Sequence, residues 1–217
     1  MPKLTLEQDK ARVKTLFDFD HKIAKSCLGK NDAIILGIDE VGRGPVAGPV
    51  AAGGVVFTND VFIQYLNDSK KITEKRRPIV AESIKENATF FDVEFASATE
   101  IDEFGIVYAL KKVFLEIIQK CEKSRIIPDL ILIDGNKIDI DPRVTTVVKG
   151  DAQSASIAAA SVIAKVARDS LMTDFGHEFP QYEWAKNKGY GTKSHTDAII
   201  KFGLTPQHRR TFLKKFI

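Results

Sequence analysis

The chain contains few of the residues and segments that mark secreted, membrane or zinc-binding proteins. Its 217 residues include two cysteines, Cys27 and Cys121, which lie far apart and lack the paired spacing of a metal site. These cysteines predict free thiols in a reducing compartment. No apolar run approaches the roughly 18 residues that a membrane span needs, and the opening MPKLTLEQDKARVK lacks the apolar stretch of a signal peptide. We therefore expect a cytoplasmic protein that makes no membrane contact.

Strong charge imbalance and low-complexity segments are also missing. Lysine and arginine outnumber aspartate and glutamate by 32 to 29, which permits a polyanionic partner without requiring one. Apolar content of 44% and charged content of 28% exclude a mainly disordered chain. Because there is no repeat or linker, we expect a single domain over residues 1–217. A helical cover over about residues 1–30 and a helical segment over about residues 175–217 would flank its centre.

The glycine motifs that bind dinucleotides and nucleoside triphosphates are absent. Gly42, Gly44 and Gly48 have the spacing GxGxxxG and lead into Pro45, whereas the dinucleotide fingerprint is GxGxxG at the start of a helix. No stretch matches the GxxxxGK[ST] phosphate loop. Gly42 and Gly44 can instead let backbone N–H groups approach a phosphate, with Arg43 adding charge. A tight turn with an exposed arginine is the alternative that this triplet leaves open.

Apolar periodicity predicts an α/β protein with five strands and helices among them. Three strands follow one another without long crossovers, and helices separate the later ones, which indicates a mixed sheet with helical cover on both sides. Gly53 and Gly54 lie inside the second strand and indicate a bulge or a close approach by another backbone. The expected strands are residues 33–39, 46–57, 89–97, 129–134 and 144–148, and the expected main helices are residues 6–26, a long helix from Thr99, and the alanine-rich and serine-rich run 152–172.

Acidic side chains stand at positions where a sheet would bring them together. Asp39 and Glu40 end the first strand, Asp134 ends the fourth, and Asp169 lies on the helix of small residues. Because the ends of neighbouring strands meet, these acids are expected to converge. Converging carboxylates raise one another's pKa unless a cation neutralises them, and Mg2+ and Mn2+ prefer such oxygen ligands. Two ions about 4 Å apart could clamp a phosphodiester displacement.

Structural explanations for the same residues remain open at this point. Successive strand residues face opposite sides, so Asp39 and Glu40 can share a site only if the strand ends or bends between them. A strand-terminal aspartate often caps a turn, and Asp169 could pair with Arg168 or Lys165. The remaining candidates are an exposed Tyr190 between two glycines, which could stack on a sugar or base or be a loop tyrosine, and four histidines without ligand spacing: His21, His177, His195 and His208.

Several motifs together closely resemble the type 2 ribonuclease H family, ribonuclease HII. They are GIDEVGRGPVAGPVAAG, LILIDG, VVKGDAQSASIAAASVIAKVARD, KGYGT followed by His195, and HRRTF, in the right order from about Gly37 to Phe212. The resemblance implies a ribonuclease H-like fold and metal-dependent endonuclease action on the RNA strand of RNA/DNA hybrids. It also implies cleavage on the 5′ side of single ribonucleotides embedded in duplex DNA, leaving 3′-hydroxyl and 5′-phosphate ends.

The resemblance assigns roles to individual residues. Gly42, Arg43 and Gly44 would grip the backbone around the ribonucleotide and sense its 2′-hydroxyl, which is the group that distinguishes RNA from DNA. Tyr190 would stack on the neighbouring deoxyribose, Lys70 in the Asp68-Ser69-Lys70 segment would contact the backbone or be structural, and the C-terminal segment would bind substrate. The family's metal-binding and catalytic acids, with Mg2+ or Mn2+, would be Asp39, Glu40, Asp134 and Asp169.

Three other interpretations compete with this one. The related ribonuclease HIII carries a longer N-terminal substrate-binding domain and a glutamate as fourth acid, whereas 38 residues precede Asp39 here and Asp169 is an aspartate. A non-catalytic nucleic-acid-binding module would show salt-sensitive binding without metal-dependent cleavage. A nuclease of the same fold acting on all-DNA substrates would cut a ribonucleotide-free duplex equally well. Both differences from ribonuclease HIII favour the type 2 enzyme, and we expect it to be a monomer.

Overall fold

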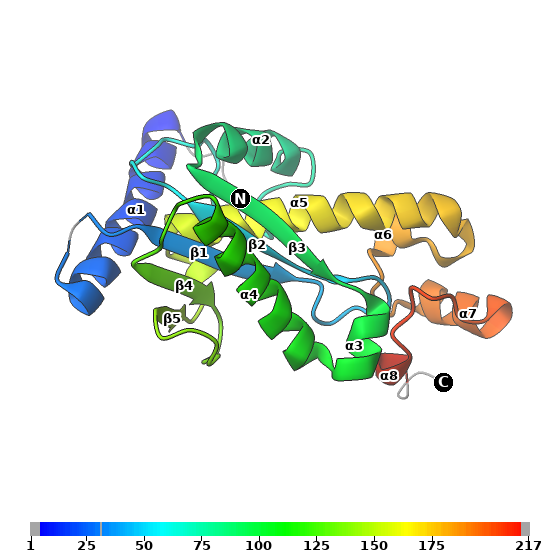
Figure 1. Cartoon of the computed structure of the whole chain (residues 1–217). Coiled ribbons are helices and arrows are strands. Elements are labelled where there is room, and N and C mark those ends of the chain that lie inside the picture. Colours follow the sequence, from blue (N-terminus) through cyan, green and yellow to red (C-terminus); the bar gives the residue numbers. More distant parts are fainter. Residues whose placement is uncertain (1–4, 31, 214–217) are drawn as a thin grey trace.

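A computed structural model describes residues 5–30 and 32–213, and it contains one five-stranded mixed sheet (Figure 1). The strand order is β3-β2-β1-β4-β5. The first three strands pair antiparallel, whereas β4 runs parallel to β1 and β5 parallel to β4. This confirms the predicted mixed sheet. The strands are β1 Ile35–Val41, β2 Val50–Val56, β3 Phe90–Ala96, β4 Leu130–Asp134 and β5 Val144–Val147.

Helices cover both faces of the sheet, as predicted. One face packs against α4 in a core built from long aliphatic side chains, and the other packs against α5 together with α1 and α2 (Figure 1). Short helices α6, α7 and α8 follow α5 along the chain. The helices are α1 Leu6–Leu28, α2 Arg77–Asn87, α3 Ala98–Phe104, α4 Ile106–Lys123, α5 Ala155–Glu178, α6 Trp184–Asn187, α7 Lys193–Phe202 and α8 Arg210–Leu213.

Local capping explains where the first helices begin and end. A capping box between Thr5 and Gln8 starts α1, and Gly29 ends it with a left-handed φ of 70°. The predicted long helix from Thr99 is wrong in two respects. Ser97 is the N-cap, and Gly105 at φ 84° divides the segment into α3 and α4.

The helix α5 lies almost on the backbone of the sheet, which the alanines and serines of its sequence permit. A Cβ atom added to Gly37 of β1 would lie 2.3 Å from the carbonyl carbon of Ser156. A Cβ atom on Gly53 of β2 would lie 2.4 Å from the carbonyl oxygen of Ala160. The predicted close approach at Gly53 is therefore confirmed. The unbroken register of β1 with β2 shows that the glycine pair does not form a bulge.

The C-terminal segment is helical, as predicted, and folds around its own small core. Trp184 is fully buried there, stacked on Tyr182 with ring centroids 5.0 Å apart. The same core includes Val46 and Ala47 from the loop between β1 and β2. Packing of these residues fixes the C-terminal segment against the loop that follows Asp39 and Glu40. Residues 214–217 of the predicted helical segment lie outside the described residues.

Two expectations from composition can be compared with the described residues. Cys27 is exposed, Cys121 is buried, and neither forms a disulfide within the described part of the chain. In that same part, no helix is both long enough and apolar enough to cross a membrane.

Candidate active site

Three aspartates converge at one edge of the sheet. Asp39, Asp134 and Asp151 each offer a carboxylate oxygen, and these oxygens all lie within 4.8 Å of one another. Asp39 comes from β1, Asp134 is the last residue of β4, and Asp151 lies in a single 3-10 turn after β5. The backbone N–H of Gly150 donates a 2.6 Å hydrogen bond to Asp134 Oδ1, which ties the turn to the end of β4. The sheet therefore brings together acids that are distant in sequence.

Glu40 follows Asp39 on β1 but is not one of the three clustered residues. Asp39 pairs with Gly53 and Glu40 with Ala52 in regular register, so β1 neither ends nor breaks between the two acids. Because Glu40 is not among the three clustered aspartates, the expectation that a shared site requires such a break stays a prediction. Asp134 lies close enough to repel both carboxylates. Asp39 and Glu40 therefore point to opposite faces of the sheet, and the Asp134 carboxylate repels both of them.

Burial and mutual repulsion destabilise the charged form of these acids. Burial raises the pKa of Asp39 well above its usual value, and Glu40 and Asp134 raise it further. Burial also raises the pKa of Glu40, although the nearby Arg43 opposes the effect. The pKa of Asp151 is raised by burial and by repulsion from acidic neighbours. These shifts mark a site whose negative charges need a cation.

The donor set fits a hard divalent metal ion. All the candidate ligands are carboxylate oxygens, and the three aspartates are close enough to share one ion. Histidine and cysteine, the ligands typical of zinc, are absent from the metal-binding group found among the described residues. Oxygen ligands of this kind suit Mg2+ and Mn2+.

The fourth predicted acid, Asp169, does not belong to this group of oxygens. Its Oδ1 lies 2.7 Å from Lys165 Nζ on the same helix, and its Oδ2 lies 3.9 Å from Arg77 Nη1. Asp169 therefore has cationic partners of its own, including one that the sequence left open as an alternative. The geometry does not support the expectation that Asp169 completes the cluster.

Sequence reasoning missed Asp151, although a usable signal was present. The strand Val144–Val147 leads into Lys149-Gly150-Asp151, just as β4 leads into Asp134 and Gly135. β5 is the neighbour of β4 in the sheet. An acid placed within a few residues of the end of a strand that neighbours an acid-bearing strand can reach the same end of the sheet. That criterion would have selected Asp151 ahead of Asp169.

The predicted Gly42-Arg43-Gly44 motif forms the loop directly beyond the acids. The Arg43 side chain is 60% exposed, and its Nη1 lies 3.7 Å from Glu40 Oε1. Gly42 has φ 89°, and a Cβ atom there would lie 2.1 Å from Arg168 Nε, so the fold itself requires this glycine. At Gly44, by contrast, an added Cβ would meet no atom of the described chain within 4 Å.

Two predicted site residues remain, Lys70 and Tyr190. Lys70 Nζ is 3.5 Å from Asp151 Oδ2, and although burial opposes its charge, Asp151 and Asp68 raise the pKa of Lys70. Tyr190 is 48% exposed, as its flanking glycines predicted. The carbonyl oxygen of Gly189 accepts hydrogen bonds from the backbone N–H groups of Val46 and Ala47. The tyrosine loop is therefore joined directly to the loop that contains Arg43.

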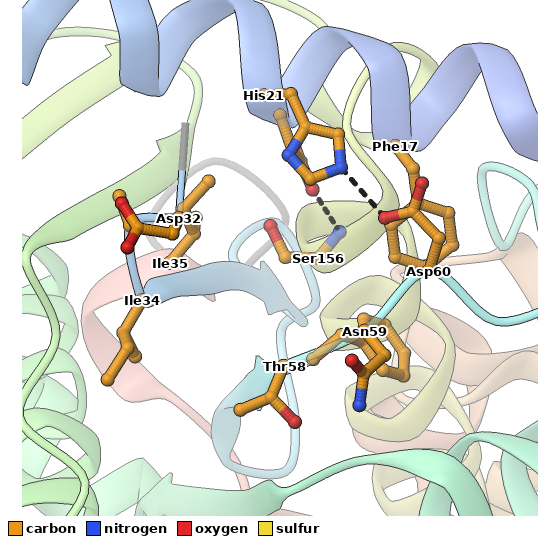
Figure 2. A pocket seen from close by; sticks show the side chains of 12 residues that line it. Phe17, His21, Asp32, Ile34, Ile35, Thr58, Asn59, Asp60 and Ser156 are labelled. Atoms are coloured by element: carbon orange, nitrogen blue, oxygen red, sulfur yellow. Dashed lines mark hydrogen bonds and ion pairs between the residues drawn. The ribbon is translucent and has the colours of Figure 1, made fainter. Parts of the chain in front are cut away.

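Two hollows in the described part of the chain differ in whether they adjoin the acids. One, of about 270 Å³, adjoins the acids, and its wall includes Glu40, Arg43 and Asp134 together with Lys111 and Lys137. The other, of about 240 Å³, lies at the start of β1 and is lined by none of the predicted site residues (Figure 2). Figure 2 shows His21 pointing toward Asp60, with 2.8 Å between Nε2 and Oδ1. We place the candidate site at the first hollow.

Solved structures identify the class of fold. The ribonuclease H2 of Pyrococcus horikoshii superposes with a TM-score of 0.70 at 25% identity, over 84% of this chain and 96% of that one. The architecture is therefore that of a ribonuclease H-like protein.

Sequence comparison then gives the family. The profile of the family described as Ribonuclease HII matches residues 36–215. The ribonuclease HII of Clostridium beijerinckii is 44% identical over 211 residues, which cover 95% of this chain and 75% of that protein. That of Endomicrobium trichonymphae is 45% identical over 199 residues, covering 91% of each chain. The chain belongs to the ribonuclease HII family, and it is an endoribonuclease of the metal-dependent ribonuclease H type that acts on RNA/DNA hybrids.

Proposed function

We propose that this endoribonuclease also cuts on the 5′ side of single ribonucleotides embedded in duplex DNA, leaving 3′-hydroxyl and 5′-phosphate ends. One observation carries the proposal. The three converging aspartates lie directly beside a glycine loop whose last glycine, Gly44, is open to close approach. Chemistry on a phosphodiester and inspection of the adjoining sugar can therefore take place within one short stretch of chain.

We assign the metal ions to Asp39, Glu40, Asp134 and Asp151, with Asp151 in place of Asp169. Mg2+ or Mn2+ bound there supplies an activated water and neutralises charge on the scissile phosphate and the leaving 3′-oxygen. The chain's own contribution is the fixed placement of the carboxylates by β1, β4 and the turn after β5. Lys70, beside Asp151, is positioned to contact a phosphate oxygen or to balance the acids between turnovers.

We assign recognition of the ribose to the loop that contains Arg43 and Gly44. Among the described residues, neither the N–H of Arg43 nor that of Gly44 donates a hydrogen bond within the protein. Unpaired N–H groups beside an open glycine can reach phosphate and sugar oxygens without hindrance from a side chain. The exposed Arg43 side chain adds positive charge at the same place.

We propose further that the chain works as a single domain and as a monomer. The C-terminal segment contributes Tyr190 to the substrate surface, where its exposed ring would stack on the deoxyribose next to the ribonucleotide. Size-exclusion chromatography with light scattering tests the monomer, and coincident unfolding transitions by fluorescence and circular dichroism test the single domain.

One assay tests the proposed activity. The purified protein is incubated with a duplex that carries a single ribonucleotide, with and without Mg2+ or Mn2+, and the cut is mapped at nucleotide resolution. We expect a metal-dependent cut on the 5′ side of the ribonucleotide and no cut in the all-DNA duplex. Equal cutting of the all-DNA duplex would support a nuclease of different specificity. Cleavage of a long hybrid without cleavage of the single-ribonucleotide duplex would remove the finer claim.

Substitution of Gly44 by alanine separates substrate contact from stability. Because an added Cβ meets no described protein atom within 4 Å, we expect the melting temperature of Gly44→Ala to stay within about 1 °C of wild type. We expect kcat/KM on a hybrid to fall about tenfold or more, because the methyl group would occupy space that the substrate needs. Steady-state kinetics and a thermal melt check both parts. Unchanged kinetics would show that substrate does not approach Gly44 closely.

Substitution of Tyr190 by alanine tests the stacking role. Base or sugar stacking on an aromatic ring contributes about 1–3 kcal/mol, so we expect turnover of the single-ribonucleotide duplex to fall roughly fivefold to a hundredfold. Metal binding, measured by calorimetry with Mn2+, should not change, because Tyr190 is not among the acids. Tyr190→Phe is the matched control, since it retains the ring. If Tyr190→Ala cleaves the single-ribonucleotide duplex at the wild-type rate, Tyr190 is a loop tyrosine without a role in binding.

A further inference from the structure

Arg209 is a fully buried arginine whose charge is not balanced by an ion pair. Its exposed fraction is 0%, and within the described part of the chain no carboxylate lies within 4.0 Å of its guanidinium. Burial and the neighbouring Arg168 lower the pKa of Arg209 to about 9, which leaves it charged at neutral pH. A buried charge without an acidic partner costs free energy, so a use for it is expected.

The guanidinium of Arg209 donates to three carbonyl oxygens of one loop. Nε donates to Gly48 O at 2.8 Å, Nη1 to Arg43 O at 3.2 Å and Nη2 to Gly42 O at 2.7 Å. The fixed fork of a guanidinium suits such a set of acceptors, which a lysine ammonium on a flexible stem could not reproduce. Arg209 therefore holds the backbone of the loop in place near both of its ends.

Because the peptide bond is planar, these contacts to the carbonyl oxygens also orient the N–H groups of the loop. In a planar trans peptide the C=O and N–H bonds point in opposite directions. Because Arg209 draws the carbonyl oxygens of Gly42 and Arg43 toward itself, the N–H groups of Arg43 and Gly44 point away from it. Neither of these two N–H groups donates a hydrogen bond to another described residue.

The N–H groups later in the same loop are, by contrast, used within the protein. Val46 and Ala47 donate to Gly189 O at 2.9 and 3.2 Å, and Gly48 donates to Gln207 O at 2.8 Å. The loop thus has bound carbonyl oxygens at its start and bound N–H groups at its end, and the N–H groups of Arg43 and Gly44 between them have no acceptor among the described residues. That pattern points to an external acceptor.

A second buried arginine supports the same loop from α5. Arg168 donates from Nε to Pro49 O at 2.8 Å and from Nη2 to Ala47 O at 3.3 Å. Its Nη1 donates to Lys188 O at 3.0 Å, two residues before Tyr190. Two guanidinium groups therefore lie behind the loop, which favours an anionic acceptor in front of it.

Arg209 is itself held at a fixed place. Its backbone N–H donates to Val46 O at 2.8 Å. The following residues, Arg210 and Thr211, donate backbone N–H groups to the Asp102 carboxylate at 2.7 and 3.0 Å, which anchors α8 to α3. If this anchor moved, the Arg209 side chain would move with it, and the amide groups of Arg43 and Gly44 would lose their orientation.

We propose that Arg209 is a positioning residue for substrate recognition. By holding the carbonyl oxygens of Gly42, Arg43 and Gly48, it presents the N–H groups of Arg43 and Gly44 to an anionic oxygen of the nucleic-acid backbone beside the scissile bond. This inference rests on the proposed function of the loop and adds the residue that gives the loop its binding conformation.

The kinetic test is Arg209→Lys, which keeps a positive charge and removes the fork. We expect kcat/KM on an RNA/DNA hybrid to fall about tenfold to a hundredfold, mainly through KM, with Mn2+ affinity unchanged. Arg143→Lys is the matched control, because Arg143 uses its fork on Asp141 and Glu122 far from the acids and should retain wild-type kinetics. A folded Arg209→Lys enzyme with kinetics within twofold of wild type would overturn the proposal. Failure of the wild-type enzyme to cleave a duplex that carries a single ribonucleotide would instead overturn the proposed function.

A measurement on the wild-type protein keeps the proposal testable if Arg209→Lys does not fold. Metal-free protein labelled with 15N is titrated with a short RNA/DNA hybrid, and backbone amide shifts are followed. We expect the amides of Arg43 and Gly44 to shift downfield with saturation, and those of Val46 and Gly48, which already have acceptors, to move much less. Equal small shifts throughout the loop would contradict the proposal.

Discussion

We expect Asp151→Asn to lower kcat on an RNA/DNA hybrid by about a thousandfold, and Asp169→Asn to lower it by less than tenfold. A metal-assisted displacement loses several kcal/mol of transition-state stabilisation when a ligand is removed, and about 4 kcal/mol corresponds to a factor of a thousand. Asp151 shares its oxygen cluster with Asp39 and Asp134. Asp169 instead forms an ion pair with Lys165, and a partly exposed pair of this kind contributes about 1 kcal/mol or less to stability.

The two variants are matched, because each replaces one partly or fully buried aspartate by its neutral isostere. The decisive measurement is single-turnover cleavage at saturating Mg2+ and again at saturating Mn2+, with a thermal melt for each protein. Calorimetric titration with Mn2+ adds an independent readout, in which Asp151→Asn should weaken binding and Asp169→Asn should not. The opposite ranking, with Asp169→Asn inactive and Asp151→Asn active, would show that the fourth ligand is the one indicated by the resemblance.

Strand patterns gave most of the fold, because each strand carries its own signal in a short stretch of chain. The apolar run that ends at Asp134 is readable from the sequence alone, and β4 places that residue at the edge of the sheet. The sequence did not predict that Gly105 divides the expected long helix into two helices. A single glycine inside a strong apolar stripe is compatible with a continuous helix, and only its φ of 84° decides the matter.

The membership of the acidic cluster was harder to predict than the positions of the strands. Asp169 shares a face of α5 with Ser161, but the helix carries Asp169 about two turns further along its axis. Asp151 precedes the helix and therefore stays near the strand ends. The role of Arg209 cannot be predicted from the sequence, because it depends on carbonyl oxygens more than 160 residues away along the chain.

The acids that we assign to catalysis are expected to destabilise the protein when no metal is bound. Asp39 is 5% exposed and is repelled by Glu40 and Asp134, so its charged form is costly in the folded state. Replacing a functional group of this kind by a neutral isostere commonly adds about 0.5–2 kcal/mol to the free energy of unfolding. For a chain of this length that corresponds to about 1–8 °C. We therefore expect metal-free Asp39→Asn to melt above metal-free wild type.

Metal binding should reverse the order of the two proteins. A ligand at a hundred times its Kd stabilises the folded state by about 2.7 kcal/mol, so saturating Mn2+ should raise the melting temperature of wild type by about 5–10 °C. Asp39→Asn should gain much less, because one of the three clustered oxygens no longer belongs to a carboxylate. Melts in EDTA and in Mn2+ give all four values. Equal gains in both proteins would place the metal away from Asp39. A lower melting temperature for metal-free Asp39→Asn than for metal-free wild type would show that the packing and hydrogen bonds of Asp39 stabilise the fold by more than its buried charge destabilises it.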